Sequence, residues 1–216
     1  AKYLLLRLPQ GSVLLHLGMS GALRVVDAAS QPGPHDHVDL VLDNGRCVRF
    51  SDPRRFGSVL WQRGHDPERH PRLRGLGPEP LATDFTGDWL RQRSRGRRAA
   101  VKAFIMDPAN VVGVGNIYAS EALFRAGIHP ARAAGRISLE RYRRLAGAIQ
   151  ATLNSAIEAG GTTLRNFLHS DGRPGYFMQQ LNVYARAGEP CRACGAPVAA
   201  RTIGQRSSYY CPRCQR

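Results

Sequence analysis

The first 63 residues alternate short apolar runs with turn-forming residues, a pattern typical of short β-strands. The apolar runs cover residues 3–8, 13–17, 22–26, 38–42, 47–50 and 58–61. Turn signals separate them, among them Pro9-Gln10-Gly11 and Asn44-Gly45. An Asn-Gly pair between two apolar runs is a strong hairpin signal. We therefore expect a β-sandwich or barrel at the start of the chain.

The spacing of apolar residues becomes helical after a stretch rich in Gly, Pro, Arg and His at residues 64–82, which we interpret as a linker. Helices are predicted from Asp84 or Thr86 to Arg93, over 98–106, over 116–126, and from Ser138 to Gly160. Asn116 is the expected N-cap of the third helix, and Gly127 its stop. A short helix from Thr162 or Thr163 and a loop over 170–176 are expected to follow.

Four cysteines near the C-terminus form two C-x-x-C pairs, Cys191 with Cys194 and Cys211 with Cys214, with sixteen residues between the pairs. This spacing predicts one structural Zn²⁺ held by four thiolates. The alternatives are two disulfides or four free thiols, which the absence of a secretory signal disfavours. Cys47 lies in a strand-like run, and we expect it to be buried without a chemical role.

The charge of the chain indicates a polyanionic partner. Its 216 residues carry a formal net charge of +15, and nucleic acid is the first candidate for so basic a protein. Lys2 and Lys102 are the only lysines, so an arginine-rich proteome is an alternative source of the charge. No apolar run is long enough to span a bilayer. We expect a cytoplasmic protein with reduced thiols.

The segment Gly113-Val114-Gly115 leads into the predicted helix at Asn116. Glycines permit close approach of the backbone to a ligand, and a helix N-terminus binds anions such as phosphate. The basic residues Arg97, Arg98 and Lys102 come shortly before it and favour the phosphate interpretation. A plain tight turn explains the two glycines equally well.

Two loops carry side chains suited to nucleic acid. Residues 52–57 include Arg54 and Phe56, which can contact a base edge and enter a base step; the alternative is a surface turn with Phe56 in the core. Met19 lies in a similar loop, and local statistics favour a core position for it. The run from His35 to His37 suits a phosphate contact, a polar loop or a metal, and two histidines with one acid make a weak metal set.

Several segments together resemble the formamidopyrimidine-DNA glycosylase family. They are residues 16–21, 52–57, 76–81, 111–121, 127–130, 160–164 and 205–206. The resemblance implies an α+β protein: an antiparallel β-sandwich domain (residues 1–70, truncated), a linker (71–83), a helix–two-turn–helix DNA-binding domain (84–182) and a zinc-finger β-hairpin (183–216). Members hold DNA in the cleft between their halves and flip a damaged purine out of the duplex.

The resemblance also implies a function in DNA base-excision repair: a glycosylase and abasic-site lyase that acts on oxidised purines such as 8-oxoguanine and formamidopyrimidines. Its partner would be double-stranded DNA with oxidised purines or abasic sites, bound by a monomer in the bacterial cytoplasm. The resemblance implies Lys2 and Arg206 as proton donors for β- and δ-elimination, and Met19, Arg54 and Phe56 as the side chains that fill the gap left by the flipped base. Further DNA contacts would come from His35, Arg97 or Arg98, and Lys102. The phosphate ligands would be Asn116 and Arg206, and the zinc ligands Cys191, Cys194, Cys211 and Cys214.

The start of the sequence departs from the family's pattern. Members begin with a nucleophilic proline followed by a catalytic glutamate, whereas this sequence begins Ala1-Lys2-Tyr3. An N-terminal amine suits attack on a sugar because its pKa is near 8, while that of a free lysine is about 10.4. We therefore expect the family's chemistry, but no activity from these 216 residues by themselves. The alternative function is a non-catalytic zinc protein that binds lesions or abasic DNA.

Overall fold

The computed structural model describes residues 2–161 and 177–216, and two compact units make up this part of the chain. The first unit comprises residues 2–74, and the second comprises residues 75–161 and 177–216. The short helix expected from Thr162 or Thr163 and the loop expected over 170–176 lie outside the described residues.

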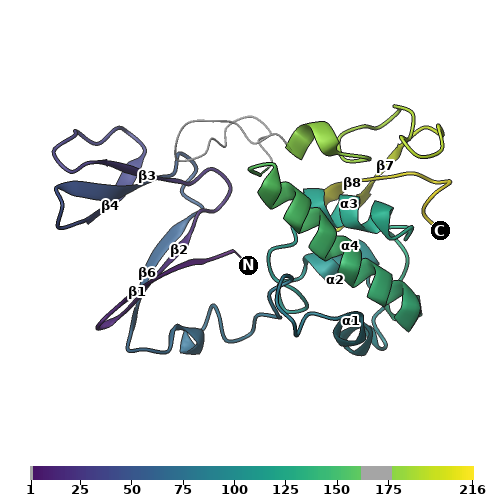
Figure 1. Cartoon of the computed structure of the whole chain (residues 1–216), viewed down its shortest axis with the longest axis horizontal. Helices are drawn as coiled ribbons and strands as arrows, with labels where there is room; N and C mark the ends of the chain where they lie inside the picture. Colours follow the sequence, from purple (N-terminus) through teal and green to yellow (C-terminus); the bar gives the residue numbers. More distant parts are fainter. Residues whose placement is uncertain (1, 162–176) are drawn as a thin grey trace. The chain divides into compact units, whose positions relative to one another are not determined.

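The first unit contains two three-stranded antiparallel sheets (Figure 1). One sheet has the order β1 (Leu4–Leu8), β2 (Gly11–His16), β6 (Ser58–Arg63), and the other has the order β3 (Ala22–Asp27), β5 (Arg46–Ser51), β4 (Asp36–Val41). All six strands predicted from the apolar runs are present, with small differences at their ends. The hairpin predicted at Asn44-Gly45 joins β4 to β5, and Gly45 adopts a φ of +76° there.

The core of the first unit is small, and its main side chains come from β2 and β5. Leu14, Leu15 and Phe50 are buried, and Cys47 is fully buried as expected. Arg49 is also buried, and it donates to Asp39 through Nε (2.8 Å) and Nη2 (2.7 Å). The same guanidinium donates to the carbonyls of Ser30 and Gln31, so it fixes the connection between β3 and β4 against the sheet.

The second unit is helical and ends in a β-hairpin (Figure 1). Its helices are α1 (Gly87–Ser94), α2 (Val101–Met106), α3 (Asn116–Arg125) and α4 (Leu139–Glu158), and the hairpin consists of β7 (Ala199–Ile203) and β8 (Arg206–Tyr210). Short 3₁₀ segments lie at η1 (Pro67–Arg69) in the first unit and at η2 (Ala134–Arg136) and η3 (Phe177–Gln180) in the second. The expected α+β class is confirmed.

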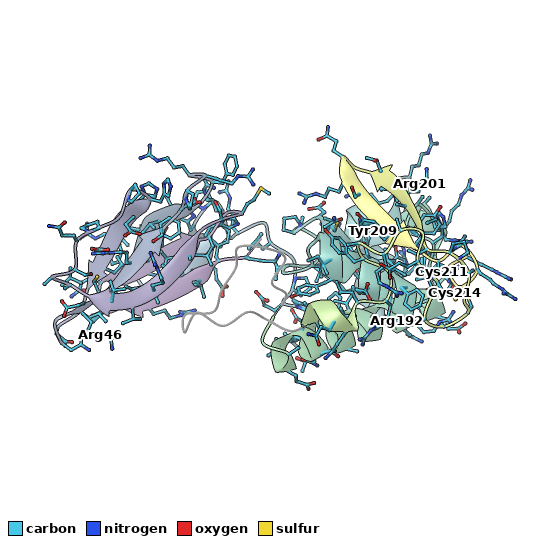
Figure 2. All side chains as sticks on the ribbon, turned by 90° about the horizontal axis from the view of Figure 1, so that it is seen from above. Arg46, Arg192, Arg201, Tyr209, Cys211 and Cys214 are labelled. Atoms are coloured by element: carbon cyan, nitrogen blue, oxygen red, sulfur yellow. The ribbon has the colours of Figure 1, made fainter. Side chains whose placement is uncertain are left out.

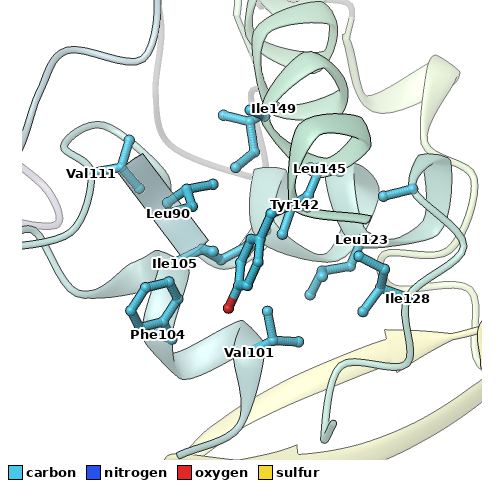
Figure 3. Packing of buried hydrophobic residues seen from close by; sticks show 14 of the residues in the cluster. Leu90, Val101, Phe104, Ile105, Val111, Leu123, Ile128, Tyr142, Leu145 and Ile149 are labelled. Atoms are coloured by element: carbon cyan, nitrogen blue, oxygen red, sulfur yellow. The ribbon is translucent and has the colours of Figure 1, made fainter. Parts of the chain in front are cut away.

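The helical core forms where α1, α2 and α3 pack around α4 (Figure 3). Tyr142 of α4 is fully buried, its ring lies edge-on to Phe104 at 6.2 Å between centroids, and its hydroxyl donates to the carbonyl of Ala134. Gly87 lets α1 approach α4 closely, because a Cβ there would lie 2.4 Å from the Cα of Arg143. The hydroxyl of Tyr142 makes its hydrogen bond inside the core, so its burial costs little free energy and the bond fixes the packing.

The helix starts refine the sequence prediction. Thr86, not Asp84, caps α1, and Ser138 caps α4 as predicted, each through its hydroxyl oxygen. The predicted start of α2 at Arg98 was wrong, because the preceding residues pair with the chain after α3 through a bridge between Ala100 and Ala133. No helix in the described part of the chain has both the length and the apolar character needed to cross a membrane.

Candidate metal centre and nucleic-acid interface

The four C-terminal cysteines converge on one point in the second unit. Their Sγ atoms all lie within 4.8 Å of one another, with Cys191 and Cys214 at 4.0 Å and Cys194 and Cys211 at 3.5 Å. Tetrahedral Zn²⁺ with Zn–S bonds of about 2.3 Å requires S–S separations of roughly 3.8 Å. The cluster therefore fits one structural zinc ion, and Figure 2 shows Cys211 and Cys214 next to each other at this point.

Tight turns bring these cysteines together. Gly195, at φ +73°, donates its N–H to the carbonyl of Cys191 and closes the first C-x-x-C turn. The N–H of Cys214 points at the sulfur of Cys211 (3.4 Å) in the second. Strands β7 and β8 meet in a two-residue turn, Gly204-Gln205, in which both residues have positive φ, as a type I′ turn requires.

Gln215 attaches this metal centre to the helices. Its side-chain oxygen accepts from the N–H of Cys211 (2.8 Å), and its amide nitrogen donates to the carbonyl of Ile128 (2.9 Å). Gln215 is buried, so both bonds are shielded from water. No local pattern predicts this role, since an isolated glutamine next to a cysteine forms no recognisable motif.

The arginines around the metal centre fall into two groups. Arg186 and Arg192 are engaged within the protein: Arg186 pairs with Glu189 at 2.8 Å, and Arg192 donates to the carbonyl of Gln179. Arg192 is nevertheless exposed, as are the remaining four: Arg201, Arg206, Arg213 and Arg216. These exposed arginines are the candidates in this region for contact with a phosphate backbone.

Lys102 is a buried cation that joins α2, α3 and β8. Its side chain is 1% exposed, and Nζ donates to Asn116 Oδ1 (2.6 Å), Ser208 Oγ (2.6 Å) and the carbonyl of Ser207 (3.0 Å). These three partners are neutral. Burial, aided by the charge of Arg206, lowers the pKa of Lys102 to about 8.

Asn116 completes the connection to the hairpin, because its Nδ2 also donates to the carbonyl of Ser207 (3.1 Å). It is the first residue of α3 and not the N-cap as predicted: Gly115 has the capping conformation. Arg206 and Lys102 line one cavity of about 190 Å³ between α2 and the hairpin turn. Three predicted site residues, Lys102, Asn116 and Arg206, are thus brought together, whereas Arg97 and Arg98 lie exposed ahead of α2.

Met19, Arg54 and Phe56 lie on two loops of the first unit. Met19 is 73% exposed and Phe56 is 58% exposed, so the alternative that they belong to the core was wrong for both. The guanidinium carbon of Arg54 lies 4.9 Å from the centroid of the Phe56 ring, within range of a cation–π interaction. Exposed apolar side chains beside an arginine suit insertion into a DNA duplex.

One buried carboxylate links the two loops, that of Asp52, which is 1% exposed. Its Oδ1 accepts from Ser20 Oγ (2.6 Å) and from the N–H of Arg54 (3.3 Å), and its Oδ2 accepts from the N–H of Gly57 (2.7 Å). From sequence, Asp52 is only the first residue of a loop; its position before a proline at a strand end is the available signal for a turn-forming side chain.

The two remaining predicted residues also lie in the first unit. His35 is exposed, and its carbonyl accepts from the N–H of Asp52 (2.9 Å), which places it beside the loop of Arg54. Lys2 is exposed just ahead of β1. Among the described residues, the four cysteines are the one set arranged to hold a metal, so the weak metal interpretation of His35 and His37 gains no support.

Curated relatives match this chain along its whole length. A protein from Syntrophotalea carbinolica named formamidopyrimidine-DNA glycosylase is 63% identical over 216 residues, which are 100% of this chain and 79% of the relative. The chain belongs to the formamidopyrimidine-DNA glycosylase family. A second member, from Alcanivorax borkumensis, is 64% identical over 100% of this chain and 80% of its own length.

Family models divide the match into three parts. Residues 1–59 match the formamidopyrimidine-DNA glycosylase N-terminal domain, residues 76–168 match the formamidopyrimidine-DNA glycosylase H2TH domain, and residues 188–216 match a zinc finger found in FPG and IleRS. The last match agrees with the cysteine geometry and with one structural zinc.

Solved structures give the same result. The MutM (Fpg) protein of Thermus thermophilus has a TM-score of 0.89 at 41% identity, over 99% of this chain and 79% of that one. The Lactococcus lactis Fpg, solved in complex with DNA that contains an abasic site, has a TM-score of 0.90 at 28% identity, over 100% of this chain and 79% of that one.

Proposed function

We propose that this protein is a DNA glycosylase and abasic-site lyase of base-excision repair that removes oxidised purines, 8-oxoguanine and formamidopyrimidines among them, in the bacterial cytoplasm. The observation that carries the proposal is the match of the β-sheet, helical and zinc-finger parts of one chain to a single glycosylase family. The proposed domains are residues 1–70, 84–182 and 183–216, with a linker over 71–83.

The second unit would bind the DNA backbone. Asn116 and Arg206 are the proposed phosphate ligands, and Lys102 holds Asn116 and the backbone of Ser207 in fixed positions. When bound, Zn²⁺ supplies folding energy to the hairpin that carries Arg206; its ligands would be Cys191, Cys194, Cys211 and Cys214. Further contacts are proposed for His35, Arg97 and Arg98, which lie exposed.

The first unit would read the damaged base pair. Met19, Arg54 and Phe56 are proposed to occupy the gap left when the damaged purine leaves the stack, with Arg54 donating to the orphaned cytosine. Their exposure supports this role, since moving an exposed apolar side chain out of water and into a base step lowers the free energy of the complex.

Elimination at the resulting abasic sugar passes a proton from C2′ to a base as the C3′–O bond to the 3′ phosphate breaks, and then a proton from C4′ to a base as the C5′–O bond to the 5′ phosphate breaks. A donor can protonate the phosphate oxygen that departs in each step. Lys2 and Arg206 are the proposed donors for the β- and δ-steps, respectively. Arg206 lies at the start of β8, beside the turn at Gly204-Gln205. In this proposal Arg206 serves both as a phosphate ligand and as the proton donor of the δ-step.

Equilibrium binding of the 216-residue chain tests the proposal. Fluorescence anisotropy would compare three duplexes: 8-oxoguanine opposite cytosine, an abasic analogue opposite cytosine, and undamaged DNA. A damaged or missing base saves part of the cost of unstacking, so we expect both lesion duplexes to bind at least about tenfold more tightly than undamaged DNA. Equal dissociation constants for all three would contradict the proposal.

A further inference from the structure

We propose that Asp52 is a positioning residue that sets the opposite-base specificity of this enzyme, by holding the loop of Met19 and the loop of Arg54 and Phe56 in one arrangement. The inference rests on the proposed function, because it takes the gap-filling role of these three side chains as its starting point. Asp52 itself acts through the loops.

The carboxylate of Asp52 accepts hydrogen bonds from both loops. Its donors are the hydroxyl of Ser20 in the loop of Met19, and the N–H groups of Arg54 and Gly57 in the other loop. Burial opposes ionisation of Asp52, but these hydrogen bonds outweigh burial and hold its pKa below the ordinary value. An ionised acceptor makes each of these bonds stronger than a neutral one would.

The loops also interlock through their backbones. Gly18 adopts a φ of +64°, and a Cβ there would lie 2.6 Å from the carbonyl carbon of Phe56. A Cβ on Gly57 would lie 2.7 Å from the carbonyl oxygen of His16 and 3.1 Å from Asp52 Oδ2. Neither glycine position has room for a side chain, so a change in one loop is transmitted to the other.

The backbone at Arg55 shows how tightly this arrangement is defined. Arg55 has a φ of +55°, in the left-handed region that non-glycine residues rarely adopt. Such a conformation is strained and persists only where the surroundings impose it. Here Asp52 binds on both sides, at the N–H of Arg54 and the N–H of Gly57, and its carbonyl accepts from the N–H of Arg55 (3.2 Å).

Burial of the three functional side chains does not maintain this loop shape. Met19 and Phe56 are mostly exposed, and the guanidinium of Arg54 lies over the ring of Phe56. The direction of Arg54 is therefore set by the backbone that Asp52 holds. Reading a base edge requires placement within about 0.5 Å, so loosening this backbone should reduce base discrimination more than overall affinity.

Asp39 provides a matched control. Its carboxylate also fixes a loop of the first unit, through two bonds from Arg49, but it touches neither the loop of Met19 nor that of Arg54. Asp39→Asn and Asp52→Asn are the same chemical change in the same unit. A general loss of stability would appear in both variants, whereas a loss of specificity is expected only from Asp52→Asn.

The experiment measures dissociation constants of the full chain for duplexes with an uncleavable abasic analogue opposite cytosine or adenine, and takes their ratio as the discrimination. We expect Asp52→Asn to lower this ratio about fivefold while affinity opposite cytosine falls only about twofold, since a bidentate base contact supplies most of the discrimination. Ser20→Ala should act in the same direction, and Ser20→Thr, which keeps the hydroxyl, should restore the ratio. Asp39→Asn should leave the ratio unchanged.

Arg54→Ala separates failure of the inference from failure of the proposed function. If Arg54→Ala leaves discrimination unchanged, the role proposed for Arg54 is wrong, and the inference is overturned with it. If Arg54→Ala lowers the ratio and neither Asp52→Asn nor Ser20→Ala does, the inference alone is wrong. Adding Asp52→Asn to Arg54→Ala should cause no further loss, and additive losses would overturn the inference. Thermal melts identify any variant that fails to fold, and Ser20→Ala, which removes one bond, then carries the test.

Discussion

At the scale of single residues, Lys102 shows what sequence and structure each contribute. Lys102 is one of only two lysines in the sequence, and it comes shortly before the segment predicted to bind phosphate. The sequence could not show that its amino group is buried among Asn116, Ser207 and Ser208. Two of these partners are more than 100 positions away in the chain. Contacts of that separation depend on the packing of β8 against α2 and α3, which no local pattern encodes.

The lowered pKa of Lys102 predicts opposite effects of alkaline pH on binding and on stability. As pH rises through about 8, the folded protein loses this charge and one of three N–H donors, so DNA affinity should fall. In the unfolded protein, Lys102 keeps its proton up to its ordinary pKa of 10.5. Between the folded pKa of about 8 and 10.5, the unfolded state therefore binds more protons than the folded state, and the contribution of Lys102 to stability should rise with pH there. Affinity and melting temperature measured from pH 7 to 9.5 would check both signs.

Lys102→Arg is the comparison for this prediction, because an arginine keeps its charge throughout this range. The step in affinity near pH 8 should disappear in the variant. A step of unchanged size would assign the titration to another group.

Met19 and Phe56 mark the limit of local statistics at this scale. Apolar residues are usually buried, so the general expectation placed both in the core. They are exposed because their loops turn them away from a small core. For Phe56 the loop itself allowed this interpretation, and the family resemblance anticipated it for both. Departures from a packing rule of this kind are expected at functional sites.

At the scale of secondary-structure elements, α3 organises the second unit through a buried acid. Glu121 is 1% exposed, and its carboxylate accepts from the N–H groups of Asn182, Val183 and Tyr184. These bonds hold the segment that leads into the zinc-binding region against α3. The sequence placed Glu121 on the third helix but gave no indication of what it contacts.

Glu121→Ala should lower the free energy of unfolding by about 3 kcal/mol, because it leaves three N–H groups without an acceptor, that of Val183 buried and those of Asn182 and Tyr184 partly buried. Denaturant unfolding measures the change. Glu140→Ala provides the control: Glu140 is an exposed acid on α4, with one long ion pair to Arg144 at 3.9 Å, so its loss should cost at most about 0.5 kcal/mol. Equal losses in the two variants would show that the buried contacts of Glu121 contribute little.

The strands and the longest helix were predictable because their signals are local. Alternating apolar runs fixed the six strands, Asn44-Gly45 fixed one hairpin, and Ser138 fixed the start of α4. The start of α2 was not predictable, since Ala100 pairs with Ala133. The helix predicted over 116–126 agrees with α3, and only the capping role of Asn116 was wrong, because its side chain bonds with Lys102. Tertiary contacts override capping preferences when a side chain has a better partner elsewhere.

At the scale of the whole molecule, hydrogen bonds attach the zinc centre and its hairpin to the helices, so we expect the two to bind DNA together. Gln215 bonds the metal-binding turn to Ile128, and Lys102 bonds α2 to β8. The cysteine spacing predicted the metal ligands from sequence alone. The attachment of the hairpin to the helices had no sequence signal.

Removal of zinc should therefore unfold the hairpin and weaken DNA binding at least tenfold, since zinc supplies about 10 kcal/mol to the folding of such modules. Anisotropy after chelation, with zinc loss verified by metal analysis, measures the effect. Added Zn²⁺ should restore binding and added Mg²⁺ should not. Unchanged affinity in verified zinc-free protein would refute this role.

The burial of Cys47 has a consequence for chemical durability. Its thiol is fully buried in β5, and burial raises its pKa, so the reactive thiolate is scarce at neutral pH. Peroxides attack thiolates, and the other four cysteines of the chain are the zinc ligands. An enzyme that repairs oxidised DNA must work while oxidants are present; in this chain the cysteine chemistry open to them is concentrated at the metal, and the exposed thioether of Met19 is a second target.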